Sequence, residues 1–222
     1  MPIEINELVR SRRKTIALIV KPDGSLVVRA PLRASNRSIH EFIAKNSQWI
    51  ERKQTQARAA VPPAPRRYIS GEDFLYLGSA YPLEIVTDQQ ESLLLNGNFK
   101  LTESALGDAR AVFERWYREQ ARRILVERVD CFARQHSFQY KRIGVTSART
   151  RWGSCSAAGS LSFSWRLILA PMQVVDYVVV HELVHTVFHD HSGQFWGRVE
   201  QICPDYREHR GWLKKNGQQL LD

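Results

Sequence analysis

The sequence has few cysteines and no long apolar run. Its three cysteines, Cys131, Cys155 and Cys203, form no CxxC pair, and a sparse, odd set of this kind is typical of reduced thiols in the cytoplasm. No apolar stretch reaches the roughly 18 residues that a membrane helix needs. The first residues, MPIEINELVRSRRK, lack the apolar core of a secretory signal. Together these absences predict a cytoplasmic location and no membrane partner.

Acidic residues are scarce in the first third of the chain. Residues 1–67 contain 14 of the 32 basic residues but only 5 of the 23 acidic ones, so they carry the whole net charge of +9. An uneven charge of this kind suggests an anionic partner, such as a nucleic acid, for the basic portion. A solvated surface that only keeps the protein soluble explains the charge equally well, and both interpretations stay open.

The pattern of apolar residues predicts an α+β fold. Two β-branched runs around Pro22-Asp23-Gly24 are typical of a hairpin, and Asn96-Gly97 marks a second hairpin. One amphipathic helix is expected over residues 35–59, followed by a stiff proline-rich linker over residues 59–67. We therefore expect a basic, mostly β N-terminal portion with one helix over residues 1–103.

A second domain is expected over residues 104–222. It begins with a long helix, continues with two strand-like segments, and ends with three helices. The first of these helices starts at Pro171, because proline is favoured in the first turn of a helix. The expected segments are residues 104–136, 140–149, 160–169, 171–189, 192–203 and 205–221.

The pentapeptide HELVH, residues 181–185, carries the strongest chemical signal. On a helix His181 and His185 share one face, and Glu182 lies beside them. Zinc binds neutral imidazoles at about 2.1 Å, and it lowers the pKa of a water that it binds to about 7, so that a nearby carboxylate can take the proton. The flanking valines indicate a buried helix, in which unpaired histidines and a glutamate are costly. The motif predicts a hydrolase with one divalent ion, zinc, and Glu182 as general base.

A third metal ligand is needed, and three residues compete for the role. His189 continues the series, but it lies about 12 Å from His181 along a helix axis, too far for one ion. His191 suits the role better because Gly193 lets the chain turn back after the helix. Glu200, on the following helix, remains the alternative.

The stretch RWGSCS indicates a segment that approaches the motif closely. Gly153 lets the backbone come near a neighbour, and an edge strand there can pair with an extended substrate. The candidate substrate-binding residues are Arg151, Trp152, Gly153, Ser154 and Cys155. A tight turn packed by Trp152 is the plainer interpretation. No partner for a Cys155 nucleophile is visible in the sequence.

Tyr177 and Arg166 are candidates for supporting roles. Tyr177 lies four residues before His181 on the same face, and Arg166 lies in a neighbouring strand-like segment. Either side chain can stabilise an oxyanion or hold a ligand in place. Both residue types more often simply pack or cap.

Longer motifs resemble one family. The segments TRWGSCSAAGSLSFSWRLILAP and DYVVVHELVHTVFHDHSGQFW are similar to the YgjP-like metallopeptidases, relatives of the SprT-like zincins, and so are RSRRKTIALIVKPDGSLVVRAP, WIERK and YLGSAYPLEI. The resemblance implies a zincin-like hydrolase domain over residues 104–222 with a polypeptide substrate. It also implies that His181, His185 and His191 hold zinc and that Glu182 is catalytic. Ser164 stands where the family commonly has asparagine, so any role of that amide is in doubt.

Two other functions stay open beside the metallopeptidase. Some proteins that resemble this family carry a nucleotide pyrophosphatase label with UTP as substrate, and the same metal-water chemistry can attack a phosphoanhydride. No Walker-type glycine loop or two-metal carboxylate motif supports that function. The SprT-like relationship and the basic residues 1–67 also fit a protease associated with DNA.

Overall fold

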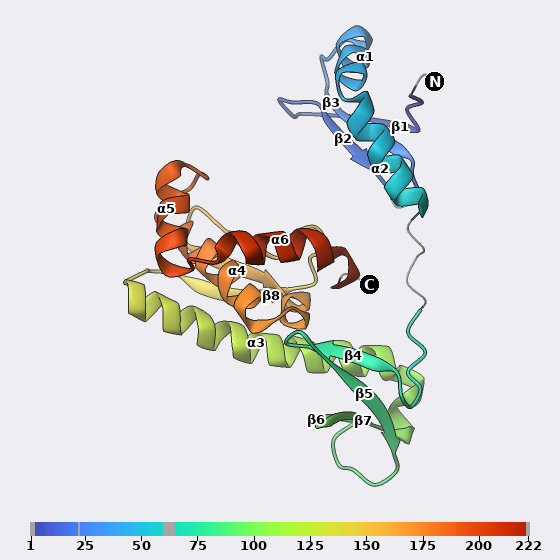
Figure 1. Ribbon diagram of the computed structural model, residues 1–222, viewed down its shortest axis with the longest axis vertical. Helices are drawn as coiled ribbons and strands as arrows, with labels where there is room; N and C mark the ends of the chain where they lie inside the picture. The colour runs from blue at the N-terminus through green and yellow to red at the C-terminus, as the bar shows by residue number, and fades with distance from the viewer. Residues whose placement is uncertain (1–2, 22, 60–64, 221–222) are drawn as a thin grey trace. The chain divides into compact units, whose positions relative to one another are not determined.

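The computed structural model describes residues 3–21, 23–59 and 65–220. These residues form an α+β fold, as the sequence predicts, in two compact units, Met1–Ala64 and Pro65–Asp222 (Figure 1). Most of the proline-rich segment expected over residues 59–67 lies outside the described residues. No helix in the described part of the chain is long and apolar enough to cross a membrane.

The N-terminal unit is built on a three-stranded sheet. Its strands are β1 (Glu7–Ser11), β2 (Ala17–Val20) and β3 (Leu26–Pro31), in the order β1-β3-β2. The predicted hairpin is confirmed, because β2 and β3 pair antiparallel across a turn in which Gly24 has φ of +83°. The parallel pairing of β1 with β3 was not expected from the sequence. The core of the unit consists of Leu26, Val28, Ala30, Ile39, Ile43 and Ile50.

Two helices follow this sheet where one was expected. Helix α1 (Asn36–Lys45) ends at Asn46, and α2 (Ser47–Ala59) begins at the next residue. Asn46 donates a side-chain hydrogen bond of 2.7 Å to the carbonyl of Phe42, which ends the first helix. The prediction of a single helix was therefore wrong at this residue.

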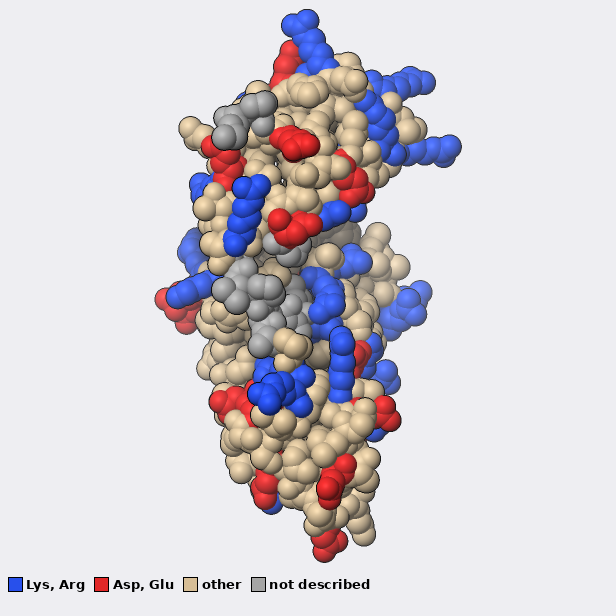
Figure 2. Space-filling model, turned by 90° about the vertical axis from the view of Figure 1, so that its right-hand side faces the viewer, with Lys and Arg blue, Asp and Glu red and all other residues tan. Residues whose placement is uncertain are grey.

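Charged side chains of the N-terminal unit are mixed in sign on the visible face. In Figure 2 its lysines and arginines stand among acidic side chains rather than in one continuous patch. Lys21 is paired with Glu7, and Arg37 is paired with Glu41. On this face the net positive charge is spread out.

The second unit begins with four strands. They are β4 (Asp73–Tyr76), β5 (Ser79–Val86), β6 (Leu93–Asn96) and β7 (Asn98–Thr102), in the order β4-β5-β7-β6. The second predicted hairpin is confirmed by the pairing of β6 with β7 around Gly97. A short 3-10 helix, η1 (Glu103–Asp108), leads into the long helix α3 (Ala109–His136).

The compact units divide after Ala64, whereas the sequence placed a boundary between residues 103 and 104. Aromatic packing explains the difference, because Phe74 of β4 stacks on Phe113 of α3 with ring centroids 4.2 Å apart. The hydroxyl of Tyr117 also donates a 2.7 Å hydrogen bond to the carbonyl of Leu75. Strands β4–β7 are thus part of the same core as the C-terminal helices.

A second small sheet and three helices complete this unit. The strands are β8 (Arg142–Thr146), β9 (Gly153–Cys155) and β10 (Ser160–Ser164), in the order β8-β10-β9, followed by the 3-10 helix η2 (Trp165–Leu169). Helix α4 (Met172–Val184) contacts α3 and also α6 (Tyr206–Asn216), which lies on its other side (Figure 1). The remaining elements are α5 (Gly193–Ile202) and the terminal 3-10 helix η3 (Gly217–Leu220).

Helix α4 is central and ends earlier than expected. Arg128 of α3 makes two hydrogen bonds, of 2.6 and 2.8 Å, to the carboxylate of Asp176, which fixes α4 against α3. The helix ends at Val184 rather than at His189. The hydroxyl of Thr186 donates to the carbonyl of Leu183 at 2.7 Å, and this bond closes the last turn. The early end lets the following residues fold back toward the helix.

Candidate metal centre

Three histidines converge at the end of α4. His181 and His185 project from the same face, and His191 follows from the segment before α5. The candidate ligand atoms of the three residues all lie within 4.8 Å of one another. The Nε2 atoms of His181 and His191 are 3.1 Å apart. The structure therefore brings together the two motif histidines and the third ligand that geometry favours.

The surroundings of His181 and His185 favour neutral imidazoles. Burial, followed by the nearby charges of His185 and His191, lowers the pKa of His181 to about 3. Burial also lowers the pKa of His185, against the opposing effect of a hydrogen bond with the carbonyl of Phe188. The Nδ1 atom of His185 lies 3.0 Å from that carbonyl, so this nitrogen carries the proton and Nε2 keeps its lone pair. Neutral imidazoles with free lone pairs are the form that binds a metal.

The arrangement fits one tetrahedral ion. Two nitrogens that each lie about 2.1 Å from such an ion are about 3.4 Å apart, close to the 3.1 Å between His181 and His191. The contact of His185 with Phe188 matches the second hydrogen bond that metal-ligating histidines usually make. Among the described residues the buried Nδ1 atom of His181 has no such partner. Of the other two candidate ligands, His189 is exposed, and Glu200 is paired with Arg207.

The start of α5 holds the three rings in place. Ser192, the residue after His191, caps this helix by accepting a hydrogen bond from the backbone of Phe195, so α5 begins at Gly193. The fully buried ring of Phe195 contacts all three imidazoles, with centroid distances of 4.9, 4.5 and 4.8 Å to His181, His185 and His191. Phe195 thus forms an apolar support behind the cluster.

Glu182 lies between α4 and the edge strand β9. Its side chain is 5% exposed, and burial raises the pKa of its carboxyl group to about 7, although Arg151 opposes the rise. A Cβ atom added at Gly153 would lie 2.5 Å from Oε1 of Glu182. The expected close approach at this glycine therefore exists, and the neighbour is the glutamate of the motif.

Replacing Gly153 with alanine should disturb the carboxylate of Glu182. The added methyl group leaves no room for the present position of Oε1, and a displacement of about 1 Å in an active site can cost 100-fold in rate. We expect kcat of Gly153→Ala to fall about 10- to 100-fold while the bound metal is retained. The matched control is Gly197→Ala, because nothing lies within 4 Å of a Cβ added there. If Gly153→Ala keeps the kcat of wild type, the close packing of Gly153 against Glu182 is not needed for catalysis.

The residues around Gly153 pack against the apolar core and line a small cavity. Trp152 packs against the apolar residues around Ala170 and Leu220, in keeping with the plainer interpretation of a packed turn. Arg151, Trp152, Gly153 and Ser154 also line a small cavity of about 120 Å³. Burial, and then the nearby Glu182, raise the pKa of the Cys155 thiol, which disfavours a thiolate nucleophile.

The chain as a whole matches a known protein family. A family model described as YgjP-like, metallopeptidase domain matches residues 14–216. The chain belongs to the YgjP-like metallopeptidase family. The resemblance seen in the sequence motifs is thereby confirmed, and membership implies a metal ion in the protein. No significant match was found among curated proteins or among solved structures.

Other residues take different places in this YgjP-like chain. Tyr177 is buried beside the cluster, with its ring centroid 5.9 Å from that of His181. Arg166 instead lines a separate cavity that none of the three histidines lines. Ser164, where the family commonly has asparagine, is buried and donates a 2.8 Å hydrogen bond to the carbonyl of Ala148, so it holds the loop before β9.

Arg210 and Tyr206 lie near the candidate metal centre of this YgjP-like chain and were not expected there from the sequence. The guanidinium of Arg210 lies 4.9 Å from the ring centroid of Trp196, and that ring stacks at 5.6 Å on His191. Tyr206 stacks on the same tryptophan at 5.2 Å. Their spacing of four residues on α6 was the available signal, since it places both side chains on one face.

Proposed function

We propose that this YgjP-like protein is a zinc metallopeptidase in which Glu182 is the general base. The observation that supports this most directly is the cluster of His181, His185 and His191 within 4.8 Å, next to a buried glutamate on the same helix. Three neutral histidines are a common ligand set of catalytic zinc, which keeps a further position open. When bound, the ion supplies Lewis-acid activation of a water and of the scissile carbonyl.

The edge strand β9 is the proposed docking site for an extended polypeptide. In the order β8-β10-β9 this strand pairs only with β10, so its other edge has no strand partner among the described residues. A substrate added there as a further strand runs past Gly153, whose backbone lies against Glu182. The scissile bond is thus brought to the carboxylate that handles the proton.

Proton transfer is assigned to Glu182. Its carboxylate accepts a proton from the attacking water as the water oxygen bonds to the carbonyl carbon of the peptide. The same group then donates that proton to the amide nitrogen as the C–N bond breaks. Tyr177 contacts His181, and Trp196, which Arg210 contacts in turn, stacks on His191. These side chains position the histidines and do not take part in the reaction.

The test is hydrolysis by the full chain, with UTP as the competing substrate. We expect about one zinc per chain, cleavage of an unfolded polypeptide, loss of that cleavage after chelation, and recovery when zinc is added back. Mass spectrometry of the fragments and a pyrophosphate assay measure the two reactions side by side. Release of pyrophosphate from UTP without peptide cleavage overturns the peptidase proposal in favour of a nucleotide hydrolase. Full peptide cleavage after complete chelation overturns the role of the metal.

A further inference from the structure

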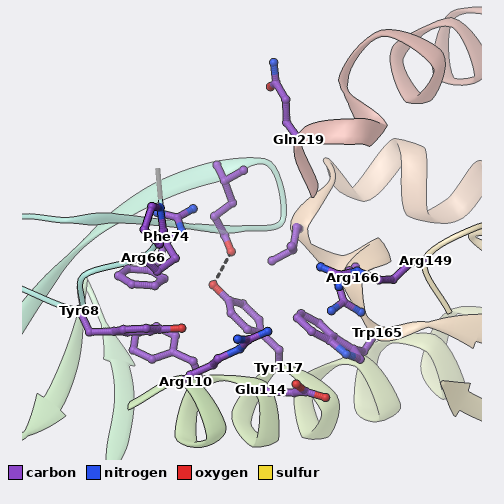
Figure 3. Close-up of a pocket in the computed structure, with 14 residues that line it drawn as sticks. Arg66, Tyr68, Phe74, Arg110, Glu114, Tyr117, Arg149, Trp165, Arg166 and Gln219 are labelled. Carbon is purple, nitrogen blue, oxygen red and sulfur yellow. Dashed lines mark hydrogen bonds between the residues drawn. The ribbon is translucent and has the colours of Figure 1, made fainter. Parts of the chain in front are cut away.

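A second cavity lies in the same unit as the metal centre, between the start of α3, β4 and η2. It has a volume of about 270 Å³ and is lined by fourteen residues, none of them from the histidine cluster (Figure 3). Four of its lining residues are arginines, namely Arg66, Arg110, Arg149 and Arg166, and one is acidic, Glu114. The sequence gave no sign of this concentration of charge, because residues 68–222 are balanced overall.

The positive charge of the cavity is only partly compensated. Glu114 is paired with Arg118, which is outside the lining, at 3.0 Å. Arg66 is paired with Glu72 at 3.5 Å. Arg110 has no ion pair with any residue that the structure describes. Figure 3 shows Arg149 beside Arg166, and the charges of these two guanidinium groups repel each other, while Glu114 attracts Arg166. An anion placed among Arg110, Arg149 and Arg166 relieves this repulsion.

Two buried donors in this cavity lack partners. Arg166 is 7% exposed, and its Nε atom has no hydrogen-bond partner among the described residues. The Nε1 atom of Trp165, also 7% exposed, lacks a partner in the same part of the chain. The hydrogen bond from Nη1 of Arg166 to the carbonyl of Ser147 is long, at 3.4 Å. Buried unsatisfied donors are costly, and both belong to side chains that line the cavity. Both atoms are closed to solvent, so a ligand with several acceptor oxygens satisfies them only after these side chains turn toward it.

The other walls of the cavity are aromatic. Tyr68, Phe74 and Trp165 line it, and the guanidinium of Arg166 lies 4.3 Å from the ring centroid of Trp165. Figure 3 shows Tyr117 between the Arg66 side and the Arg166 side, with its hydroxyl engaged by the carbonyl of Leu75. Phe74 stacks on Phe113 and Trp165 stacks on Tyr117, so these rings offer a ligand mainly their edges. One side of the cavity therefore suits an anionic group, and the aromatic side chains give apolar contact to the rest of a small ligand.

We propose that this cavity binds a small organic phosphate with an aromatic ring, of the nucleoside monophosphate class, at a site separate from the metal centre. Planar guanidinium forks match phosphate oxygens in pairs, and a phosphate dianion compensates more of the arginine charge than a single carboxylate does. The volume of about 270 Å³ lies just below the range of about 300–1,000 Å³ that is usual for ligand pockets, so it suits a small ligand.

The site also borders the segment that leads to the candidate catalytic residues. Arg149 lines the cavity, and Gly153, four residues later, lies against Glu182. Arg166 contacts the carbonyl of Ser147 in the same segment. A ligand held by Arg149 and Arg166 therefore stabilises the loop that precedes the edge strand β9.

The experiment is a calorimetric titration of the full chain with AMP at low ionic strength. The other probes are adenosine and inorganic phosphate. We expect AMP to bind more tightly than either one, and Arg110→Gln to weaken AMP binding about tenfold or more. Arg110 is exposed, so this variant should fold normally. Arg166→Gln tests the buried donor and is expected to weaken binding at least as much.

Two controls separate this site from its surroundings. Arg115→Gln removes an exposed charge from the same helix but outside the cavity, and should leave AMP binding within twofold of wild type. His181→Ala, which alters the histidine cluster, should also leave it unchanged. Absence of AMP binding, or equal weakening by Arg110→Gln and Arg115→Gln, overturns the proposal. If inorganic phosphate binds as tightly as AMP, the nucleoside part of the proposal is overturned. These readouts measure binding, so they do not depend on peptidase activity.

Discussion

The Glu182→Gln variant is expected to keep its metal and lose about 100- to 10,000-fold in kcat, the range that general acid–base catalysis contributes. Glutamine has nearly the shape of glutamate, so it fits the space beside Gly153 without disturbing α4. It cannot accept the proton of the attacking water, and this chemical step is therefore the one that fails. Metal content of the purified protein and kcat for polypeptide cleavage are the two measurements.

A structural effect of this substitution can be separated from a chemical one. The buried carboxyl group, with its pKa raised to about 7, is costly to ionise, so its replacement by a neutral amide should not destabilise the fold. We expect an unchanged or slightly higher melting temperature. A Glu182→Gln protein that binds metal and still cleaves at the rate of wild type would rule out Glu182 as the base.

His181→Ala is expected to weaken zinc binding by more than about 100-fold. Even residues that only hydrogen-bond to a metal ligand typically contribute 10- to 100-fold to metal affinity, and a ligand itself contributes more. The remaining two histidines leave an incomplete ligand set, so peptidase activity should fall to background. A metal that binds only the folded chain, at a free concentration 100 times its Kd, stabilises the fold by about 2.7 kcal/mol. Zinc should therefore raise the melting temperature of wild type clearly, but not that of the variant.

The matched control for that experiment is His189→Ala. His189 is exposed and is not part of the histidine cluster, so its loss should leave zinc affinity and activity unchanged. If His181→Ala and His189→Ala bind zinc as tightly as wild type, the cluster at the end of α4 is not the metal site.

Local spacing allowed much of the candidate site to be predicted. The distance between His181 and His189 along a helix excludes one ligand, and the structure brings His191 back to the other two histidines as expected. Gly193 does not make the turn, because it is the first residue of α5 and has no positive φ, so the chain turns back before His191. Gly153 was expected to approach a neighbour closely because it lacks a side chain, and it does so. Short-range geometry of this kind depends on the backbone alone.

Features that depend on long-range packing could not be predicted in the same way. The stacking of Phe74 on Phe113 joins β4 to α3 across the expected boundary at residue 103, and no local pattern records that contact. The second cavity likewise brings Arg166 together with three other arginines that come from separate segments of the chain. In both cases the partner is remote in the sequence, so periodicity carries no information about it.

The early end of α4 gives a bound ion a mechanical role. His181 lies in the helix, His185 caps its end, and His191 belongs to the segment that follows, so an ion held by all three closes a loop with five residues between His185 and His191. Ordering so short a loop costs little entropy. The ion acts as a removable cross-link, and its release should loosen residues 186–192 while the buried part of α4 stays folded. The protein can therefore gain or lose its metal by local opening, without global unfolding.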